Sequence, residues 1–239
     1  SLQRIKLTLK LLTIFGEQQL IKMSQLIFKF PFKTNYFEED FYVSSNNFEA
    51  YKLLESWPKW SGKFINIFGP SGCGKTHLAN IFNKKINSFF IKALELKNST
   101  LSEIKAKECL IVDEYKNNVD EKLFYSVLSQ SHLSNQYIII NSSKPIQSFE
   151  IKLNDLKSRF SSFVNIGIDL PTDELIKVII SKNFSDKQVK IESKLLDYII
   201  KNIDRSYESV FDLINKLDDF SLSAGRSINI NLIKKALNK

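Results

Sequence analysis

The glycines of this chain are few and unevenly placed. Only seven occur among 239 residues, and three of them, Gly69, Gly72 and Gly74, fall within six positions. A chain that uses so little glycine is expected to cluster it where the backbone must adopt conformations closed to other residues. The cluster follows an apolar run typical of a strand, residues 64–68, and precedes one typical of a helix, residues 76–82. This order favours an α/β fold in which the turn follows a buried strand.

The turn has the sequence Gly-Pro-Ser-Gly-Cys-Gly-Lys-Thr over residues 69–76, which matches the P-loop pattern G-x-x-x-x-G-K-[S/T] at every fixed position. In such a loop, backbone N–H groups and the start of the helix face the phosphates of a nucleotide. We expect Lys75 to reach the β- and γ-phosphates and Thr76 to ligate Mg²⁺. The sequence therefore predicts a site for ADP or ATP with Mg²⁺. Its P-loop residues are Gly69, Pro70, Ser71, Gly72, Cys73, Gly74, Lys75 and Thr76.

A second motif, Cys-Leu-Ile-Val-Asp-Glu at residues 109–114, reads as a buried strand that ends in two carboxylates. Asp113 would hold Mg²⁺ through its water shell, and Glu114 would polarise the water that attacks the γ-phosphate. A further apolar run, residues 137–140, also ends in polar residues. It predicts a polar sensor on a strand between the P-loop strand and the acidic strand. The polar residues that follow this run are Asn141, Ser142 and Ser143.

The apolar pattern changes near residue 170. Before it, short apolar runs alternate with segments long enough for helices, which predicts a parallel sheet with crossover helices. These runs lie at residues 64–68, 89–91, 109–112, 137–140 and 163–168. After it, apolar residues recur at helical spacing, and Pro171, Thr172 and Asp173 form a helix start. We therefore predict an α/β nucleotide-binding domain over residues 41–170 and a small all-α domain over residues 171–239.

Four segments, in this order along the chain, resemble the AAA+ domain of the bacterial replication initiator family DnaA. They are Gly74–Leu78 (GKTHL), Val112–Glu114 (VDE), Ile140–Pro145 (INSSKP) and Leu156–Phe160 (LKSRF). The resemblance covers residues 41–238. It implies an AAA+ P-loop three-layer sandwich, in which a five-stranded parallel sheet is followed by an all-α lid.

The resemblance also implies roles for individual residues. The segment of that family that matches residues 41–47, with Asn47, lies against the adenine, and His77 joins the nucleotide-binding set. The implied sensor residues are Asn141 and Ser143. Arg159 stands in the position of the arginine finger, which reaches the γ-phosphate of a nucleotide on a neighbouring subunit. An arginine supplied in this way stabilises transition-state charge and couples hydrolysis to assembly.

One position in the lid departs from the family pattern. AAA+ lids usually carry a sensor arginine early in a lid helix, and the residue aligned there is Glu208. Two alternatives follow: either Arg205, one turn earlier, takes the sensor role from a shifted position, or the lid does not touch the γ-phosphate. Because of this departure we expect at most a weak ATPase, whose main activity is to regulate another ATPase.

The two ends of the chain indicate which members of the DnaA family it resembles most. DnaA initiators carry a DNA-binding helix-turn-helix domain after the lid, whereas this chain ends at Lys239. This difference favours the Hda-like members of the family, which promote hydrolysis of DnaA-bound ATP when tethered to the sliding clamp. Those members begin with a clamp-binding peptide of the form Q-L-x-L-x-L, which places a glutamine amide and apolar side chains in pockets of the clamp. The matching residues here are Gln25, Leu26, Phe28 and Phe30.

The only methionine, Met23, is interpreted as the native start of the chain. Residues 1–22 are then a non-native or disordered extension, and residues 23–40 form a segment that carries the clamp-binding peptide. The formal charge is +8, of which residues 1–22 supply +3 and the remainder +5. Because no basic run with interleaved aromatic residues stands out, we expect any contact with DNA to be indirect or weak.

Composition excludes several classes of protein. Hydrophobic residues make up 43% and charged residues 25%, as in ordinary globular domains. No uncharged apolar run approaches the ~20 residues needed to cross a bilayer, and two cysteines cannot build a disulfide scaffold. We expect a cytoplasmic protein whose partners are DnaA and the sliding clamp, with self-association left open.

Two alternatives to this interpretation remain. One is a DNA-binding ATPase of the DnaA or helicase-loader type. The other is a P-loop kinase that phosphorylates a small molecule. The acidic pair at residues 113–114, the LKSRF segment and a lid that follows the sheet all count against the kinase.

Overall fold

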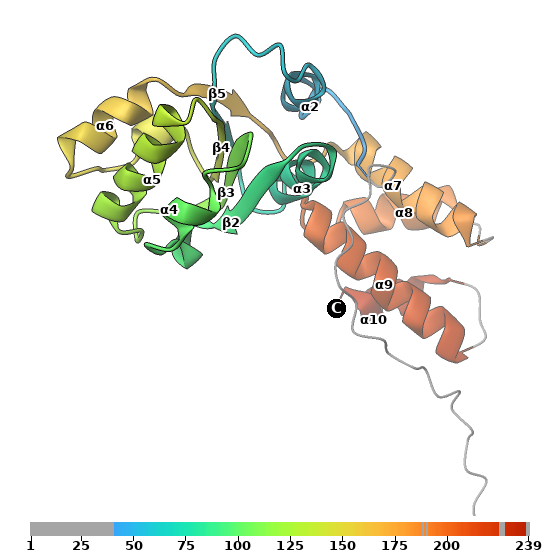
Figure 1. The fold of residues 1–239 in the computed structure, drawn as a ribbon. Coiled ribbons are helices and arrows are strands. Elements are labelled where there is room, and N and C mark those ends of the chain that lie inside the picture. The colour runs from blue at the N-terminus through green and yellow to red at the C-terminus, as the bar shows by residue number, and fades with distance from the viewer. Residues whose placement is uncertain (1–40, 188, 190, 225–227, 238–239) are drawn as a thin grey trace, which may run out of the picture. The chain divides into compact units, whose positions relative to one another are not determined.

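The computed structural model describes residues 41–187, 189, 191–224 and 228–237. Its centre is a five-stranded parallel sheet with the strand order β2-β3-β4-β1-β5 (Figure 1). The strands are β1 (Phe64–Phe68), β2 (Ser88–Lys92), β3 (Cys109–Tyr115), β4 (Tyr137–Ser142) and β5 (Val164–Gly167). The prediction of a five-stranded parallel sheet is confirmed, and β4 lies between the P-loop strand and the acidic strand as expected.

Helices cover both faces of this sheet, because a parallel sheet buries both faces. Side chains alternate along a strand, so Leu110 and Val112 of β3 join one apolar cluster while Cys109 and Ile111 join the other. Figure 1 shows α5 and α6 on one side of the strands and α3 on the other. The first layer comprises α4 (Thr100–Glu103), α5 (Glu121–Leu133) and α6 (Asn154–Ser161), and the second comprises α2 (Phe48–Glu55) and α3 (Lys75–Lys85).

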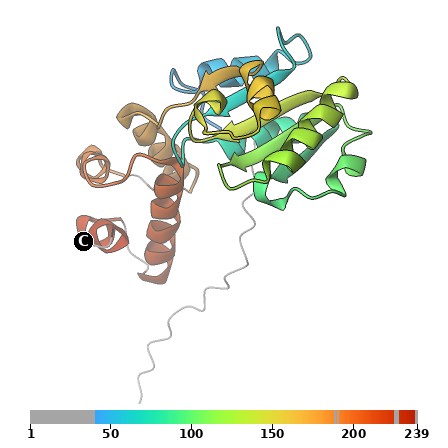
Figure 2. The ribbon, with the colours of Figure 1, turned by 90° about the vertical axis from the view of Figure 1, so that its left-hand side faces the viewer.

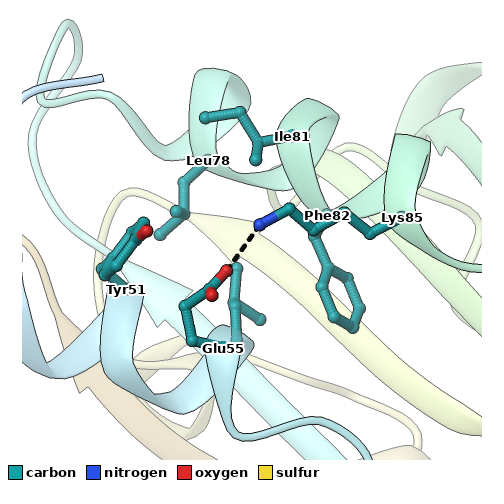
Figure 3. Close-up of a pocket in the computed structure, with 7 residues that line it drawn as sticks. Tyr51, Glu55, Leu78, Ile81, Phe82 and Lys85 are labelled. Carbon is teal, nitrogen blue, oxygen red and sulfur yellow. Dashed lines mark hydrogen bonds and ion pairs between the residues drawn. The ribbon is translucent and has the colours of Figure 1, made fainter. Parts of the chain in front are cut away.

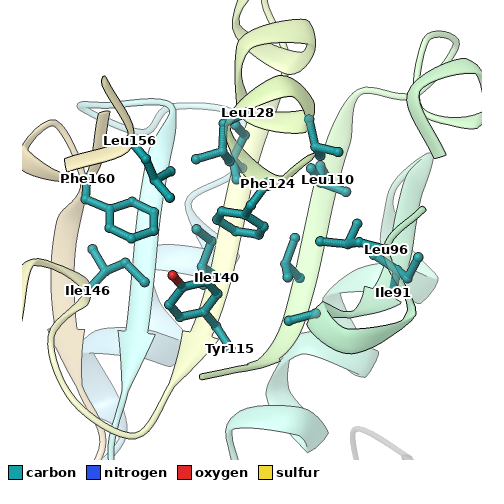
Figure 4. Packing of buried hydrophobic residues seen from close by; sticks show 14 of the residues in the cluster. Ile91, Leu96, Leu110, Tyr115, Phe124, Leu128, Ile140, Ile146, Leu156 and Phe160 are labelled. Carbon is teal, nitrogen blue, oxygen red and sulfur yellow. The ribbon is translucent and has the colours of Figure 1, made fainter. Parts of the chain in front are cut away.

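The core of the first layer is rich in aromatic rings. Phe124 of α5 and Phe160 of α6 are almost completely buried, with their ring centroids 6.0 Å apart (Figure 4). The ring of Tyr115, at the end of β3, packs against both of them. Burial of each large apolar side chain contributes about 1.5–3 kcal/mol, so this cluster anchors α6 firmly on the sheet.

The second layer is built from α2 and α3. Leu54 of α2 packs with Leu78 and Phe82 of α3, and all three side chains are buried. An ion pair between Lys85 Nζ and Glu55 Oε1, at 2.6 Å, spans the two helices beside these apolar residues (Figure 3). Both partners are more than one-third exposed, so burial of the apolar residues contributes more to the packing than the ion pair does.

A buried asparagine fixes the turn that follows β4. The amide of Asn66, on β1, donates to Ile140 O and to Ser142 Oγ, each at 2.8 Å. Its Oδ1 accepts from the backbone N–H of Ile146, also at 2.8 Å. Because each of these polar atoms has a partner, the polar end of β4 is held in a fixed position without an unpaired buried group.

In the described part of residues 168–237, four helices follow the sheet, shown in orange to red in Figure 2. They are α7 (Asp173–Asp186), α8 (Ser193–Ile200), α9 (Tyr207–Ala224) and α10 (Ile230–Ala236), and we call them the lid. The helix start predicted at residues 171–173 is present, since Thr172 Oγ1 accepts from Leu175 N and caps α7. The apolar residues predicted at helical spacing form the core of the lid. The domain boundary at residue 170 stays a prediction.

Some predicted features lie outside the described residues. These are the extension at residues 1–22, the segment 23–40 and, within it, the clamp-binding residues Gln25, Leu26, Phe28 and Phe30. In the part of the chain that the structure describes, no helix is long and apolar enough to cross a membrane.

Candidate nucleotide-binding site

The P-loop lies between β1 and α3, at the carboxyl edge of the sheet, and each of its glycines has a geometric reason. Gly72 and Gly74 have φ angles of +74° and +100°, which residues with a side chain rarely adopt. Gly69 has no room for a side chain, because a Cβ there would lie 2.1 Å from Ile168 O. The clustering of glycine in an otherwise glycine-poor chain therefore follows from the backbone path of this loop.

The ammonium group of Lys75 lies over the loop. Its Nζ donates to the carbonyl oxygens of Gly69 and Pro70 at 2.7 and 2.8 Å. It also lies 3.6 Å from Cys73 Sγ, and burial raises the pKa of that thiol. Lys75 thus places a positive charge directly at the turn whose backbone conformation favours an anion.

Three side chains beneath the loop form a hydrogen-bonded line. The hydroxyl of Thr76, in the first turn of α3, donates to Asp113 Oδ2 at 2.9 Å. The amide of Asn141, near the end of β4, donates to Asp113 Oδ1 at 2.8 Å. Both Asp113 and Asn141 are almost completely buried. The structure therefore joins residues that three separate sequence motifs singled out.

This arrangement fits a nucleotide with Mg²⁺. Thr76 and Asp113 present a hydroxyl and a carboxylate, which are oxygen ligands of the kind Mg²⁺ prefers, next to a phosphate-binding turn. Asn141 Oδ1 is buried and has no hydrogen-bond partner among the described residues. The described residues contain no group of three or more His, Cys, Asp and Glu side chains able to hold a metal ion.

Glu114 is turned away from this line. The pairing of β3 with β4 shifts register between Val112 and Tyr115, and Glu114 has a φ of +56°. Its carboxylate forms an ion pair with Lys92 Nζ, at the end of β2, at 2.7 Å. The hydrogen bond to Glu114 raises the pKa of Lys92. A bulge at a strand end re-aims a side chain in this way, and here it brings the predicted catalytic carboxylate to a lysine.

The N-terminal segment 41–47 is organised by Asn47. Its side chain is 1% exposed, its Oδ1 accepts from Ser44 N, and its Nδ2 donates to Tyr42 O and to the hydroxyl of Tyr207. Asn47 therefore fixes the backbone of segment 41–47, which the family resemblance places against the adenine. Its own amide is occupied by partners within the chain.

The predicted sensor residues differ in their surroundings. Asn141 contacts Asp113, as described, whereas Ser143 is exposed. Arg205 forms an ion pair with Asp173, at the start of α7, through contacts of 2.8 and 3.1 Å. The sensor roles of Ser143 and Arg205 stay predictions.

The predicted arginine finger lies on α6, away from the hydrogen-bonded line. Arg159 is in the last turn of the helix, and its carbonyl accepts from the backbone N–H and the hydroxyl of Ser162. Within the described ranges, its guanidinium has no hydrogen-bond or ion-pair partner. His77 packs its ring edge-on against Phe41, with centroids 5.4 Å apart.

Two residues of the site were missed at the level of sequence. Lys92 directly follows an apolar run, as Asp113 and Asn141 do. This position at the end of a predicted strand could have marked Lys92 as a residue of the site. Tyr207 contacts the P-loop through its backbone, with its N–H donating to Gly72 O at 2.9 Å. It adjoins Glu208, the aligned sensor position, but nothing in the residue type pointed to the contact.

Comparisons with known proteins agree with this geometry. The family model described as "Hda, lid domain" matches residues 173–237, and one described as "RNA helicase" matches residues 65–164. The DnaA initiator of Buchnera aphidicola is 28% identical over 90% of this chain and 53% of its own length. The chain spans about half the length of the curated relatives it matches.

Solved structures show the same fold. Domain III of DnaA from Thermotoga maritima aligns with a TM-score of 0.71 at 19% identity, covering 87% of this chain and 98% of that one. AMPPCP-bound DnaA from Aquifex aeolicus aligns with a TM-score of 0.65 at 20% identity, covering 78% of this chain and 66% of that one.

The strand order, the P-loop and the helical lid are those of the AAA+ fold. Among proteins with this fold, the matches include DnaA initiators and the Hda lid. The chain is similar to DnaA initiators over 90% of its length, and residues 173–237 are similar to the Hda lid.

Proposed function

We propose that this protein is a nucleotide-binding AAA+ regulator of chromosome replication initiation, which binds the sliding clamp and stimulates hydrolysis of DnaA-bound ATP. The observation that carries the proposal is the match of residues 173–237 to the Hda lid, directly after a sheet that carries a complete P-loop. The whole-chain similarity to DnaA initiators supports a role in replication initiation.

ADP or ATP with Mg²⁺ is the proposed ligand. The DnaA structure from Aquifex aeolicus binds AMPPCP, which supports a nucleotide site in the matching loop here. Lys75 would neutralise phosphate charge, while Thr76 and Asp113 would hold Mg²⁺, the ion that compensates the charge of the phosphate oxygens. Asn141 would fix the Asp113 carboxylate and offer its free Oδ1. The exposed Ser143 stays in the proposed sensor set.

Slow turnover by this chain itself follows from two pairings. Lys92 competes with water for the carboxylate of Glu114, the residue proposed to polarise the attacking water. Arg205 is paired with Asp173, and the aligned lid position holds Glu208 in place of an arginine. We therefore propose at most a weak ATPase that acts mainly on another ATPase.

Arg159 is the proposed arginine finger for that other ATPase. The helix α6 is anchored by Leu156 and Phe160, which are both buried, while the guanidinium of Arg159 makes no pairing among the described residues. A cation held on an anchored helix suits insertion into a neighbouring nucleotide site. The proposed partners are DnaA and the clamp, in the cytoplasm, with DNA contacted indirectly or weakly and self-association left open.

The test is a turnover assay of DnaA-bound ATP with clamp loaded on DNA. The wild-type protein should stimulate hydrolysis, and Arg159→Ala should lose that stimulation, since a finger is worth ~10³ to 10⁵ in rate at its strongest. Lys157→Ala, on the same helix, is the matched control and should stimulate normally. Normal binding of ADP by Arg159→Ala would show that its own P-loop is intact. Equal stimulation by wild type and Arg159→Ala would contradict the finger assignment.

The clamp interaction has its own test. A clamp pull-down should retain the wild-type chain and lose the Gln25→Ala/Phe28→Ala variant. Failure of the wild type to bind the clamp, together with tight binding of single-stranded DNA, would favour the alternative of a DNA-binding DnaA-like or helicase-loader-like ATPase.

A further inference from the structure

Tyr207, the first residue of α9, contacts three separate parts of the chain. Its backbone N–H donates to Gly72 O in the P-loop at 2.9 Å, and its hydroxyl accepts from Asn47 Nδ2 at 3.3 Å. Its ring is close to Gly74, where an added Cβ would lie 3.5 Å from the ring carbon Cε2. The side chain is buried, with 9% exposed, so these contacts are shielded from water.

The P-loop side of this joint is sterically tight. At Gly72 an added Cβ would lie 2.5 Å from the Cβ of Ser206, the neighbour of Tyr207. At Gly74 it would meet the rings of both Tyr207 and Phe41 at 3.5 Å. The first turn of α9 thus lies directly against the two glycines whose positive φ angles create the phosphate-binding turn. A change in the path of that turn must move Tyr207 or break its contact.

The segment 41–47 also contacts the lid through a second residue. Besides the Asn47 bond to Tyr207, the ring of Tyr42 lies under Lys182 Nζ of α7, 5.2 Å from the ring centroid. Asn47 meanwhile holds the carbonyl of Tyr42 and the N–H of Ser44. The Tyr207 hydroxyl therefore joins the lid to the residue that organises this segment.

We propose that Tyr207 is a positioning residue that makes nucleotide binding and the seating of the lid depend on each other. This role of Tyr207 depends on the nucleotide site proposed above. Tyr207 holds the Gly72 carbonyl and the Asn47 turn in one arrangement, so a ligand that favours this arrangement also favours the seated lid. By linkage, the seated lid raises the affinity for the ligand by the same factor.

The test uses the full chain and a fluorescent ADP analogue with Mg²⁺. Tyr207→Phe keeps the ring and the backbone N–H and removes only the hydroxyl bonded to Asn47. It should weaken binding about threefold to tenfold, as expected for loss of one buried hydrogen bond. Tyr198→Phe, on α8 of the lid, is the matched control and should bind as the wild type does.

Two further measurements separate this role from a merely structural one. Amide hydrogen exchange should show that nucleotide protects the first turn of α9 in the wild type. In Tyr207→Phe, which keeps the N–H bond to Gly72 O, this protection should be reduced while protection of the P-loop persists. The Asn47→Ala variant removes the other end of the same bond, so the double variant should lose less affinity than the two single losses combined.

The outcomes distinguish this inference from the proposed function. Wild-type affinity in Tyr207→Phe with unchanged protection of α9 would overturn the role of Tyr207 and leave the nucleotide site standing. Absence of any ADP binding by the wild type would overturn the nucleotide site itself, and this inference with it.

Discussion

The carboxyl edge of the sheet and the first turns of the lid are both candidates to contact the nucleotide, but they are built differently. At the sheet edge, Asp113 and Asn141 meet because β3 and β4 are neighbours, and Thr76 joins them from the first turn of α3. In the lid, Arg205 pairs with Asp173, and Tyr207 makes the contact with the P-loop. Sheet topology fixes which residues meet, whereas the packing of a helix end against a loop depends on side chains from distant parts of the chain.

The strongest test of the sheet edge is Lys75→Ala. This change removes the positive charge that lies over the turn, so affinity for ADP with Mg²⁺ should fall about a hundredfold or more. Thermal unfolding with and without ligand measures the loss, and stability without ligand should barely change. Lys84→Ala, on the same helix, is the control and should keep the wild-type response. Full ligand stabilisation in Lys75→Ala would refute the site.

The next effect tests the backbone of the same edge. Gly69→Ala should lower the free energy of unfolding by about 2–3 kcal/mol, because its Cβ would lie 2.1 Å from a backbone oxygen of residue 168. Gly62→Ala is a matched control, since its Cβ would lie 3.7 Å from Val164 Cγ2, an ordinary contact. Urea unfolding of both variants measures the difference. Equal stabilities would mean that the P-loop path is not constrained as described.

A smaller effect concerns the lid contact and pH. Burial raises the pKa of Tyr207 to about 12. The stability that comes from keeping this phenol neutral is fully present below about pH 10, the ordinary tyrosine value, and is lost as pH rises towards 12. At pH 10.5 the wild type should therefore have lost about 1 kcal/mol relative to its value at pH 8. Tyr207→Phe should lack this part of the loss. Identical pH profiles would indicate that Tyr207 is accessible to water.

The smallest expected effect concerns Arg205. Its side chain is 59% exposed and that of Asp173 is 37% exposed, so solvent screens their pairing. Arg205→Ala and Asp173→Ala should each lower the free energy of unfolding by about 0.5 kcal/mol, and the double variant should add little. ATP titrations of the same variants sharpen the comparison. A clear loss of ATP affinity in Arg205→Ala alone would support its predicted sensor role.

The fold was largely predictable because its signals are local. Apolar runs such as residues 109–112 and 137–140 are continuous, since strands buried on both faces need no polar side. The P-loop could be recognised because eight consecutive residues specify one backbone path. The meeting of Asp113 with Asn141 was also predictable, because both stand at the carboxyl ends of parallel strands.

Three contacts of the site could not be predicted from the sequence, and the reason is physical in each case. The Tyr207 contact uses a backbone N–H, which every residue except proline carries, so no residue type marks it. The pairing of Glu114 with Lys92 depends on a register shift at the end of β3, which the residue pattern does not reveal. The occupation of the Asn47 amide by partners within the chain likewise depends on a tyrosine 160 positions away.

The backbone conformation at Glu114 is strained. Among the residues that the structure describes, two other than glycine have a φ of +56°, Asn135 and Glu114. Asparagine tolerates this conformation, whereas a longer side chain sacrifices about 1 kcal/mol or more of folding free energy. Glycine at position 114 would relieve the strain but would remove the carboxylate. Selection for heat-resistant variants should therefore favour glycine at this position, and such variants should lose the carboxylate proposed to polarise the attacking water while they keep Arg159.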